Sequence, residues 1–273
     1  MSFSTIMVHL DLDHSSETLL QIAANLAERF DARLIGITAG DIQPLYFMEG
    51  DAAQEMLEKD RASLLSEIAA KERKFREMFK HRAAKIEWRS ALKWPADFVA
   101  AEARAADLLI VGSSGQGNDS LRQVDPGDLV LRAGRPVLVV PHKIEWLKFG
   151  NVIVAWKDTR EARRAVNDAL PLLHQAKEVT VIELVERDDD RHAAKSRIDD
   201  VAAWLVRRGI NAATIATKAL IGVPDQLLII AKDEGAEMIV AGAYGHARFR
   251  EWVFGGVTRN LLMQQKCCVL LSH

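Results

Sequence analysis

Two pairs of glycines between residues 240 and 262, in VAGAYGHARFREWVFGGVTRNLL, have the spacing of a loop that could bind phosphate. Gly242 and Gly245 directly follow a strand-like segment, and Gly255 and Gly256 precede a predicted helix that has Thr258 in its first turn. Glycine lets the backbone approach a ligand closely, and a helix start presents unpaired N–H groups at the positive end of its dipole. On spacing alone, an anion site and a set of tight turns are equally good interpretations.

Residues near these glycines could supply the charge that a phosphate site needs. Lys157 and Asp158 follow the apolar segment NVIVAW, and Lys157 could face phosphate, although a solvated surface lysine is the favoured interpretation. His246 and Arg248 lie inside the loop, and Arg248 is the better candidate for a polyphosphate contact. The P-loop pattern GxxxxGK[ST] is absent, and so is GxGxxG after the first strand.

Other catalytic and metal-binding patterns are missing. The eight histidines lack a metal-ligand spacing such as HExxH, and GxSxG is absent, so no metal and no nucleophilic triad is predicted. The two cysteines, Cys267 and Cys268, are adjacent, which excludes a disulfide framework and favours a cytoplasmic location. In CCVLL they are interpreted as small strand residues rather than as a redox or metal-binding pair.

The composition favours a soluble globular protein. The chain has 273 residues, of which 49% are hydrophobic and 27% are charged, enough to bury a core in one large domain or two ordinary ones. A net charge of −2 disfavours nucleic acid as the main ligand. The apolar runs are too short for a membrane span, and the N-terminus MSFSTIMVHLDLD lacks the features of a secretion signal.

The chain repeats itself once. AADLLIVGSSGQG (105–117) is echoed by GAEMIVAGAYGHA (235–247), so that Gly112 and Gly115 match Gly242 and Gly245. The openings STIMVHLDLD and GNVIVAWKDT also resemble each other. Each copy has the size of a domain, which predicts a tandem duplication with domains at 1–143 and 149–273, joined near HKIEWLKFG.

Strand-like and helix-like segments alternate in each copy. Strands are predicted at 6–10, 33–38, 85–92, 107–112 and 136–141, and again at 151–156, 178–185, 213–220, 237–242 and 267–272. Helices are predicted near 19–30, 52–80, 95–105, 160–175, 195–208, 224–234 and 256–265. This alternation predicts two doubly wound α/β domains, each with a five-stranded parallel sheet of order 3-2-1-4-5. Ligands of such sheets bind at the carboxyl ends of strands 1 and 4, which is where the glycine loop begins.

The loop resembles the nucleotide-binding signature of the universal stress protein family. That signature is GxxG, nine residues, then a glycine and a small residue, and the second copy has Gly242-x-x-Gly245, nine residues and Gly255-Gly256. The resemblance covers essentially the whole chain as two tandem domains. It implies the same five-stranded sheet, binding of ATP, ADP or AMP in many members and in others none, and pairing of domains through strand 5, within one chain in tandem members.

The resemblance also implies the binding residues of the second copy. The family's phosphate-contacting Ser or Thr corresponds to Gly256, and the lost hydroxyl costs about 1 to 3 kcal/mol of affinity if nothing replaces it. The family's strand-1 Asp corresponds to Lys157, with Asp158 one place further on. The residues carried over are Ala155, Trp156, Lys157, Asp158, Ala241, Gly242, Gly245, His246, Arg248, Gly255, Gly256, Val257 and Thr258.

The first copy departs from the signature in the opposite way to the second: it keeps the strand-1 Asp but loses the glycine spacing. Asp11 stands at the family's strand-1 Asp position, but eleven residues separate Gly115 from Gly127, and Asp128 follows. A carboxylate there repels phosphate and would itself occupy the helix N-terminus. The segment Asp125–Asp128 is interpreted as a turn and helix cap, so the first domain is predicted to be structural and to bind no nucleotide.

These features favour a cytoplasmic tandem universal stress protein that binds ATP or AMP, with or without Mg²⁺, in its second domain. It would act as a stress-response sensor or regulator with an unidentified protein partner, as a monomer or a homodimer, away from nucleic acid and membranes. No residue stands out as a general base, so at most slow ATP hydrolysis is expected. The alternative is an interaction scaffold of the same fold without nucleotide, which would use its sheet edges and the 42–56 loop. An enzyme of the adenine-nucleotide alpha hydrolase type ranks last, because SGGxDS is absent after strand 1.

Overall fold

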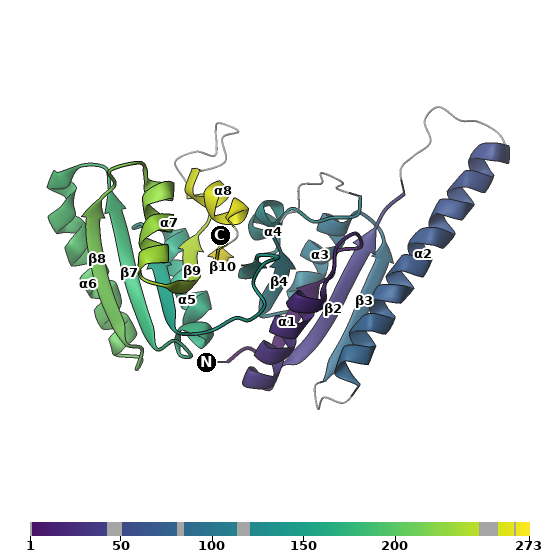
Figure 1. Ribbon diagram of the computed structural model, residues 1–273, viewed down its shortest axis with the longest axis horizontal. Helices are drawn as coiled ribbons and strands as arrows, with labels where there is room; N and C mark the ends of the chain where they lie inside the picture. The colour runs from purple at the N-terminus through teal and green to yellow at the C-terminus, as the bar shows by residue number, and fades with distance from the viewer. Residues whose placement is uncertain (1, 43–50, 81–84, 114–120, 246–255, 265) are drawn as a thin grey trace.

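The computed structural model arranges the chain as one ten-stranded sheet with helices on both faces (Figure 1). It describes residues 2–42, 51–80, 85–113, 121–245, 256–264 and 266–273. The strand order is β3-β2-β1-β4-β5-β10-β9-β6-β7-β8. The predicted order 3-2-1-4-5 is therefore confirmed in each half, and the two predicted sheets are joined edge to edge.

The strands of the two halves correspond one to one. The first half contains β1 (Thr5–His9), β2 (Arg33–Gly40), β3 (Ile86–Leu92), β4 (Leu108–Gly112) and β5 (Val137–Val140). The second half contains β6 (Asn151–Ala155), β7 (Glu178–Val185), β8 (Ala212–Lys218), β9 (Ala236–Gly242) and β10 (Cys268–Ser272). Within each half every pairing is parallel, as expected for apolar strands that alternate with helices.

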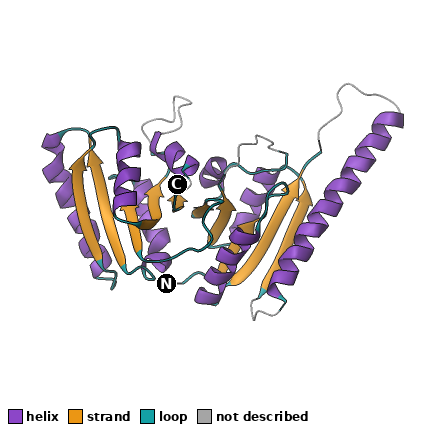
Figure 2. Cartoon of the chain, viewed as in Figure 1, coloured by secondary structure: helices purple, strands orange, loops and turns teal. Residues whose placement is uncertain are grey.

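The helices also fall close to their predicted positions (Figure 2). The first half contains α1 (Glu17–Phe30), α2 (Asp51–Phe79), α3 (Pro95–Glu102) and α4 (Pro126–Arg132). The second contains α5 (Arg160–Leu173), α6 (Arg191–Val206), α7 (Val223–Asp233) and α8 (Gly256–Met263). Helix α6 begins earlier than predicted, because the three aspartates of the preceding turn, 188–190, place negative charge at its N-terminus.

The sheet is buried between two apolar layers that run through both halves. One cluster contains residues of α1 and β1 together with residues of α5, β6 and β10, and the other contains residues of α4 and β5 together with residues of β9 and α8. Neighbouring positions of β1 point to opposite faces, so Ile6 and Val8 belong to the first cluster and Met7 to the second. The core is thus shared by the two halves of the chain.

The halves are joined by the only antiparallel pairing among the described strands. Strand β5 pairs with β10, with Val139 opposite Val269 and Leu138 opposite Leu270. Outside the sheet, Arg29 Nη1 donates a 2.9 Å hydrogen bond to Gln175 Oε1. This antiparallel joint gives the molecule an approximate twofold arrangement of its two halves.

None of the helices in the described part of the chain combines the length and the apolar character that crossing a membrane would need.

Candidate functional site

The carboxyl ends of β6 and β9 lie side by side in the second half. Ala155 is paired in register with Ala241, which places Gly242 and Trp156 at the adjoining strand ends. Trp156 is buried, and its backbone N–H donates a 2.7 Å hydrogen bond to the carbonyl of Ile182. The predicted residues of the two strand ends are therefore brought together at the switch point of this half.

Lys157 and Asp158 lie on the surface next to these strand ends. Both are exposed, and the Asp158 carboxylate accepts a 2.5 Å hydrogen bond from Arg163 Nη2. The next residue, Thr159, is the N-cap of α5 and accepts a hydrogen bond from the backbone N–H of Ala162. Asp158 thus has a partner on the helix that follows it, α5, and Lys157 places a cation at the end of β6.

Gly242 has a packing role in addition to the phosphate contact that the sequence predicts for it. A Cβ at this position would lie 2.5 Å from the backbone nitrogen of Ala162 and 2.6 Å from the carbonyl carbon of Glu161. The first turn of α5 therefore rests directly on the end of β9. Only glycine permits this approach, since both nearby atoms belong to backbone that cannot rotate away.

Glu161 is a buried carboxylate that the sequence reasoning missed. It is 1% exposed, and its Oε1 accepts a 2.5 Å hydrogen bond from Arg160 Nε. Burial alone would raise the pKa of Glu161, but hydrogen bonds from Arg160, its own backbone and Thr159 outweigh burial and lower the pKa. Its Oε2 lies 3.6 Å from the place of a Cβ on Gly245, so a negative charge faces the glycine turn. The sequence did contain a signal for this carboxylate, because an acidic residue stands in the first turn of the helix that follows the first strand of the second half.

Helix α8 begins at Gly256, one of the predicted site residues. Gly256 is exposed, Val257 is half-buried and Thr258 is buried. Among the described residues, a Cβ on Gly256 would meet Pro224 alone, at 3.8 Å, so these residues leave room for a larger side chain there. The predicted residues His246, Arg248 and Gly255 lie outside the described residues.

Tyr244, inside the GxxG turn, connects this turn to the first half of the chain. It has a φ of 53°, in the left-handed region that a tyrosine rarely adopts. A Cβ on Gly127 would lie 2.7 Å from the Tyr244 hydroxyl, so that hydroxyl sits on the first turn of α4. Burial, followed by the nearby carboxylates of Asp125 and Asp128, raises the pKa of Tyr244 to about 12. The glycine loop of one half thus touches the equivalent helix start of the other.

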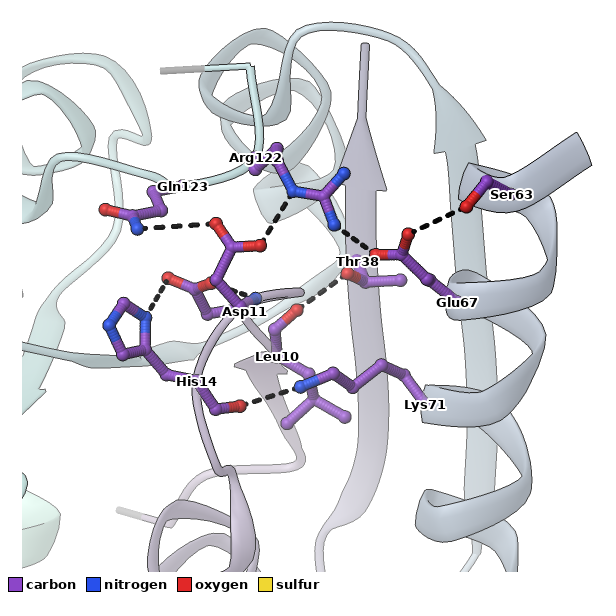
Figure 3. Close-up of polar contacts among 10 residues, drawn as sticks. Leu10, Asp11, His14, Thr38, Ser63, Glu67, Lys71, Arg122 and Gln123 are labelled. Atoms are coloured by element: carbon purple, nitrogen blue, oxygen red, sulfur yellow. Dashed lines mark hydrogen bonds and ion pairs between the residues drawn. The ribbon is translucent and has the colours of Figure 1, made fainter. Parts of the chain in front are cut away.

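In the first half, the switch point contains a cavity of about 200 Å³. Strand β1 contributes His9 to it, and the residues that follow β1 contribute Asp11 and His14. Ser113 lines it after β4, and His142 lines it after β5. The rings of His14 and His142 are 5.5 Å apart. His14 Nδ1 also lies 3.4 Å from Asp11 Oδ2 (Figure 3).

His9 is the most buried titratable group of this cavity. Burial lowers the pKa of His9 to about 4, with Asp11 opposing the shift and Lys71 adding to it. Lys71 comes from α2, where burial lowers its pKa, and its Nζ donates a 2.7 Å hydrogen bond to the carbonyl of His14 (Figure 3). The imidazole of His9 is therefore neutral across the physiological range.

A second contact holds α2 against the loop that follows β1. Arg122 Nε donates a 2.7 Å hydrogen bond to Asp13, and the same guanidinium pairs with Glu67 of α2 (Figure 3). Both cations beside the cavity, Lys71 and Arg122, are thus occupied by protein oxygens. In the residues that the structure covers, no group of three His, Cys, Asp or Glu side chains could hold a metal ion.

Comparison with known proteins identifies the family. The model of the universal stress protein family matches residues 2–141 and again 148–273, so the chain belongs to this family as a tandem member. A universal stress protein from Archaeoglobus fulgidus is similar in structure, with 16% identity, a TM-score of 0.70, and coverage of 98% of this chain and 95% of that one. Another from Pseudomonas aeruginosa has 14% identity, a TM-score of 0.66, and coverage of 99% and 93%. No curated protein matches the sequence.

Proposed function

We propose that the second domain binds an adenine nucleotide, ATP or AMP, and that this binding serves a stress-response sensor or regulator. The observation that carries the proposal is the in-register pairing of Ala155 with Ala241, which puts the ends of β6 and β9 together at the switch point. The glycine spacing of the family signature begins at this point, and α8 starts from Gly256 at the end of the same loop.

The charges of the two halves support the choice of the second domain. The helix after the glycine loop begins with Gly256 in the second half, whereas the equivalent position of the first half is Asp128. A carboxylate at a helix N-terminus repels phosphate and itself occupies the positive end of the helix dipole. Glu161 works against an anion at the Gly245 turn itself. The phosphates would therefore bind toward the start of α8, away from that carboxylate.

Gly256 offers a direct test of this placement. The part of the chain that the structure describes leaves room for a serine there, because the one residue in it that the serine Cβ would meet is Pro224, at 3.8 Å. In calorimetric titrations of the full chain with ATP and AMP, with and without Mg²⁺, Gly256→Ser should tighten binding by about tenfold through one new hydrogen bond to a charged group. Gly256→Ala is the matched control, which adds the Cβ without the hydroxyl and should leave the affinity unchanged.

Two results would count against the proposal. If neither nucleotide binds the natural chain or Gly256→Ser, the second domain is not a nucleotide site, and the interaction scaffold becomes the better explanation. If nucleotide binds but Gly255→Asp leaves the affinity unchanged, the phosphates do not bind at the glycine loop.

We also propose that the protein acts in the cytoplasm as a monomer or homodimer with a regulatory protein partner, and that any ATP hydrolysis is slow. The two adjacent cysteines, which form no disulfide framework, support this location. Sedimentation of the purified chain with and without ATP measures the oligomeric state, and phosphate release over hours measures hydrolysis.

A further inference from the structure

We propose that an open groove on the first half of the molecule binds a basic, arginine-containing segment of another protein. The groove has a volume of about 530 Å³ and is lined by residues of α1, of α2 and of the linker between the two halves, residues 142–150. The inference rests on the regulatory partner of the proposed function, to which it assigns a surface and a chemistry. It does not depend on the nucleotide.

The fold forms this groove from three segments that cover the same face of the sheet. Helices α1 and α2 both lie on this face (Figure 1), since Leu20 of α1 and Phe75 of α2 are buried in one core cluster. The linker joins them there, because Leu147 packs against the same cluster. Other side chains of these segments, such as Thr18, Met78 and Trp146, then line the groove.

The lining of the groove is acidic. Lys74 Nζ of α2 lies 2.6 Å from Glu17 Oε1 of α1, and hydrogen bonding by Lys74 lowers the pKa of Glu17, so both groups are charged at neutral pH. Among the described residues that line the groove, the carboxylates of Glu17, Glu77 and Glu145 outnumber this one ammonium group. Lys80 lies 3.9 Å from Glu77, and both side chains are largely exposed, so this pair neutralises little charge.

Trp146 gives the groove an exposed aromatic anchor. Its side chain is 57% exposed, although tryptophan has a large apolar surface to bury. Tryptophan is enriched among the residues that dominate the binding energy of protein interfaces. Met78, which is half-buried in the same groove, adds an apolar surface that can adapt to a partner. An aromatic anchor in a groove of this kind is typical of a surface that another protein covers.

The indole and the carboxylates together select arginine. A guanidinium group can stack on the indole of Trp146 while its N–H groups donate to the carboxylate of Glu145. An apolar residue next to the arginine would contact Met78. The chain already contains one such stack, in which the guanidinium carbon of Arg208 lies 3.6 Å from the ring centroid of Trp204. The fitting partner is therefore a segment in which arginine and apolar residues alternate or adjoin.

The same charges argue against a second copy of the chain as the occupant. In a twofold dimer the same surface of each copy faces the other. The acidic lining of one groove would then face the acidic lining of its equivalent, and like charges across an interface are unfavourable. A basic segment of a different protein meets no such repulsion.

The experiment uses two short peptides, one of alternating arginine and leucine and one of alternating glutamate and leucine. Each is titrated into the full chain, and the indole N–H signal of Trp146, assigned with the variant Trp146→Phe, is followed by NMR. We expect the arginine peptide alone to shift this signal, and its affinity to fall as the salt concentration rises. The proposal is overturned if neither peptide shifts the signal or if both shift it equally.

A matched pair of tryptophan variants places the peptide in the groove. Trp146→Ala should weaken binding of the arginine peptide by about tenfold or more in calorimetric titrations, as truncation of an aromatic anchor does. Trp94→Ala removes another exposed tryptophan of the first half, which lies outside the groove, and should leave the affinity unchanged. Both side chains are on the surface, so the fold should persist in each variant. Equal responses of the two variants, including no response, would overturn the proposal.

A pair of charge reversals tests the acidic lining. Glu145→Lys should weaken binding of the arginine peptide, whereas Glu58→Lys, at an exposed position of α2 outside the groove, changes the net charge equally and should not. Equal effects would mean that net charge alone attracts the peptide, which would overturn the proposal. Sedimentation tests the other occupant: self-association that Trp146→Ala abolishes would place a second copy in the groove instead. A chain that binds nucleotide but not the arginine peptide would keep the proposed nucleotide site and lose only this inference.

Discussion

Gly127, Gly242 and Gly256 occupy corresponding loops of the two halves, yet they have different neighbours. Gly242 leaves room for the backbone of α5, and Gly127 leaves room for a tyrosine hydroxyl from the other half. For Gly256, the one neighbour of a Cβ within the described ranges is Pro224, at 3.8 Å. Packing therefore explains two of these glycines, while the described neighbours of the third leave room for a ligand or for a larger side chain.

At the same scale, His9 should make the stability of the protein depend on pH. Its pKa is about 4 in the folded chain against 6.5 when solvated, so the unfolded chain binds the proton first as pH falls. The free energy of unfolding should be unaffected by His9 above about pH 6.5 and should decrease by up to about 3 kcal/mol toward pH 4. Urea unfolding at a series of pH values measures this slope.

The variant His9→Gln isolates the contribution of this residue. It does not titrate in this range, so the slope between pH 6.5 and 4 should become shallower than in the natural chain. An unchanged slope would mean that other groups, such as the carboxylates near Lys71, dominate the pH dependence.

At the scale of the secondary-structure elements, the contact of α4 with Tyr244 leads to a prediction about how tightly the two halves pack. Gly127→Ala would place a Cβ 2.7 Å from the Tyr244 hydroxyl and 3.2 Å from Leu262, so overpacking should destabilise the protein by about 1 to 3 kcal/mol. Tyr244→Phe removes the clashing oxygen and should recover part of this loss in the double variant. Thermal or urea unfolding of the four combinations measures the coupling.

The control is Gly112→Ala, at the end of β4 in the same half of the chain. Among the described residues, its Cβ would meet His142 alone, at 3.7 Å, so stability should change by less than about 0.5 kcal/mol. If Gly127→Ala were as harmless as this control, the contact between Tyr244 and α4 would not be tight.

Much of the element arrangement could be predicted from the sequence, because apolar periodicity is a local property of the chain. The segment NVIVAW predicted β6, and the alternation of strands and helices predicted the order of each half-sheet. The cavity could not be predicted, since His9, Ser113 and His142 meet only after three separate strands align. The contact between Tyr244 and Gly127 could not be predicted either, because it joins two domains whose relative placement the apolar periodicity does not specify.

For the whole molecule, the joint between β5 and β10 is the feature on which the shared core depends. Cys268 lies in β10, between β5 and β9, and is fully buried, and Cys267 just before the strand is 4% exposed. Burial raises the pKa of Cys267 to about 11 and that of Cys268 to about 12, so almost no thiolate is present at pH 8. Because the thiolate is the reactive form, alkylation of these cysteines should occur only when the pairing between β5 and β10 opens.

This protection predicts how a change in the first half acts on the cysteines of the second. Val139→Ala in β5 removes packing opposite Val269 and should speed iodoacetamide labelling of Cys268 by about tenfold or more, since a buried valine truncation costs more than about 1.4 kcal/mol. Val8→Ala in β1 is the matched control, equally buried in the first half but away from the joint. Labelling that responds to both variants alike would mean that the cysteines report unfolding of the whole chain rather than opening of the joint. A larger effect of Val139→Ala would show that the two halves can separate at the antiparallel pair while each retains its own fold.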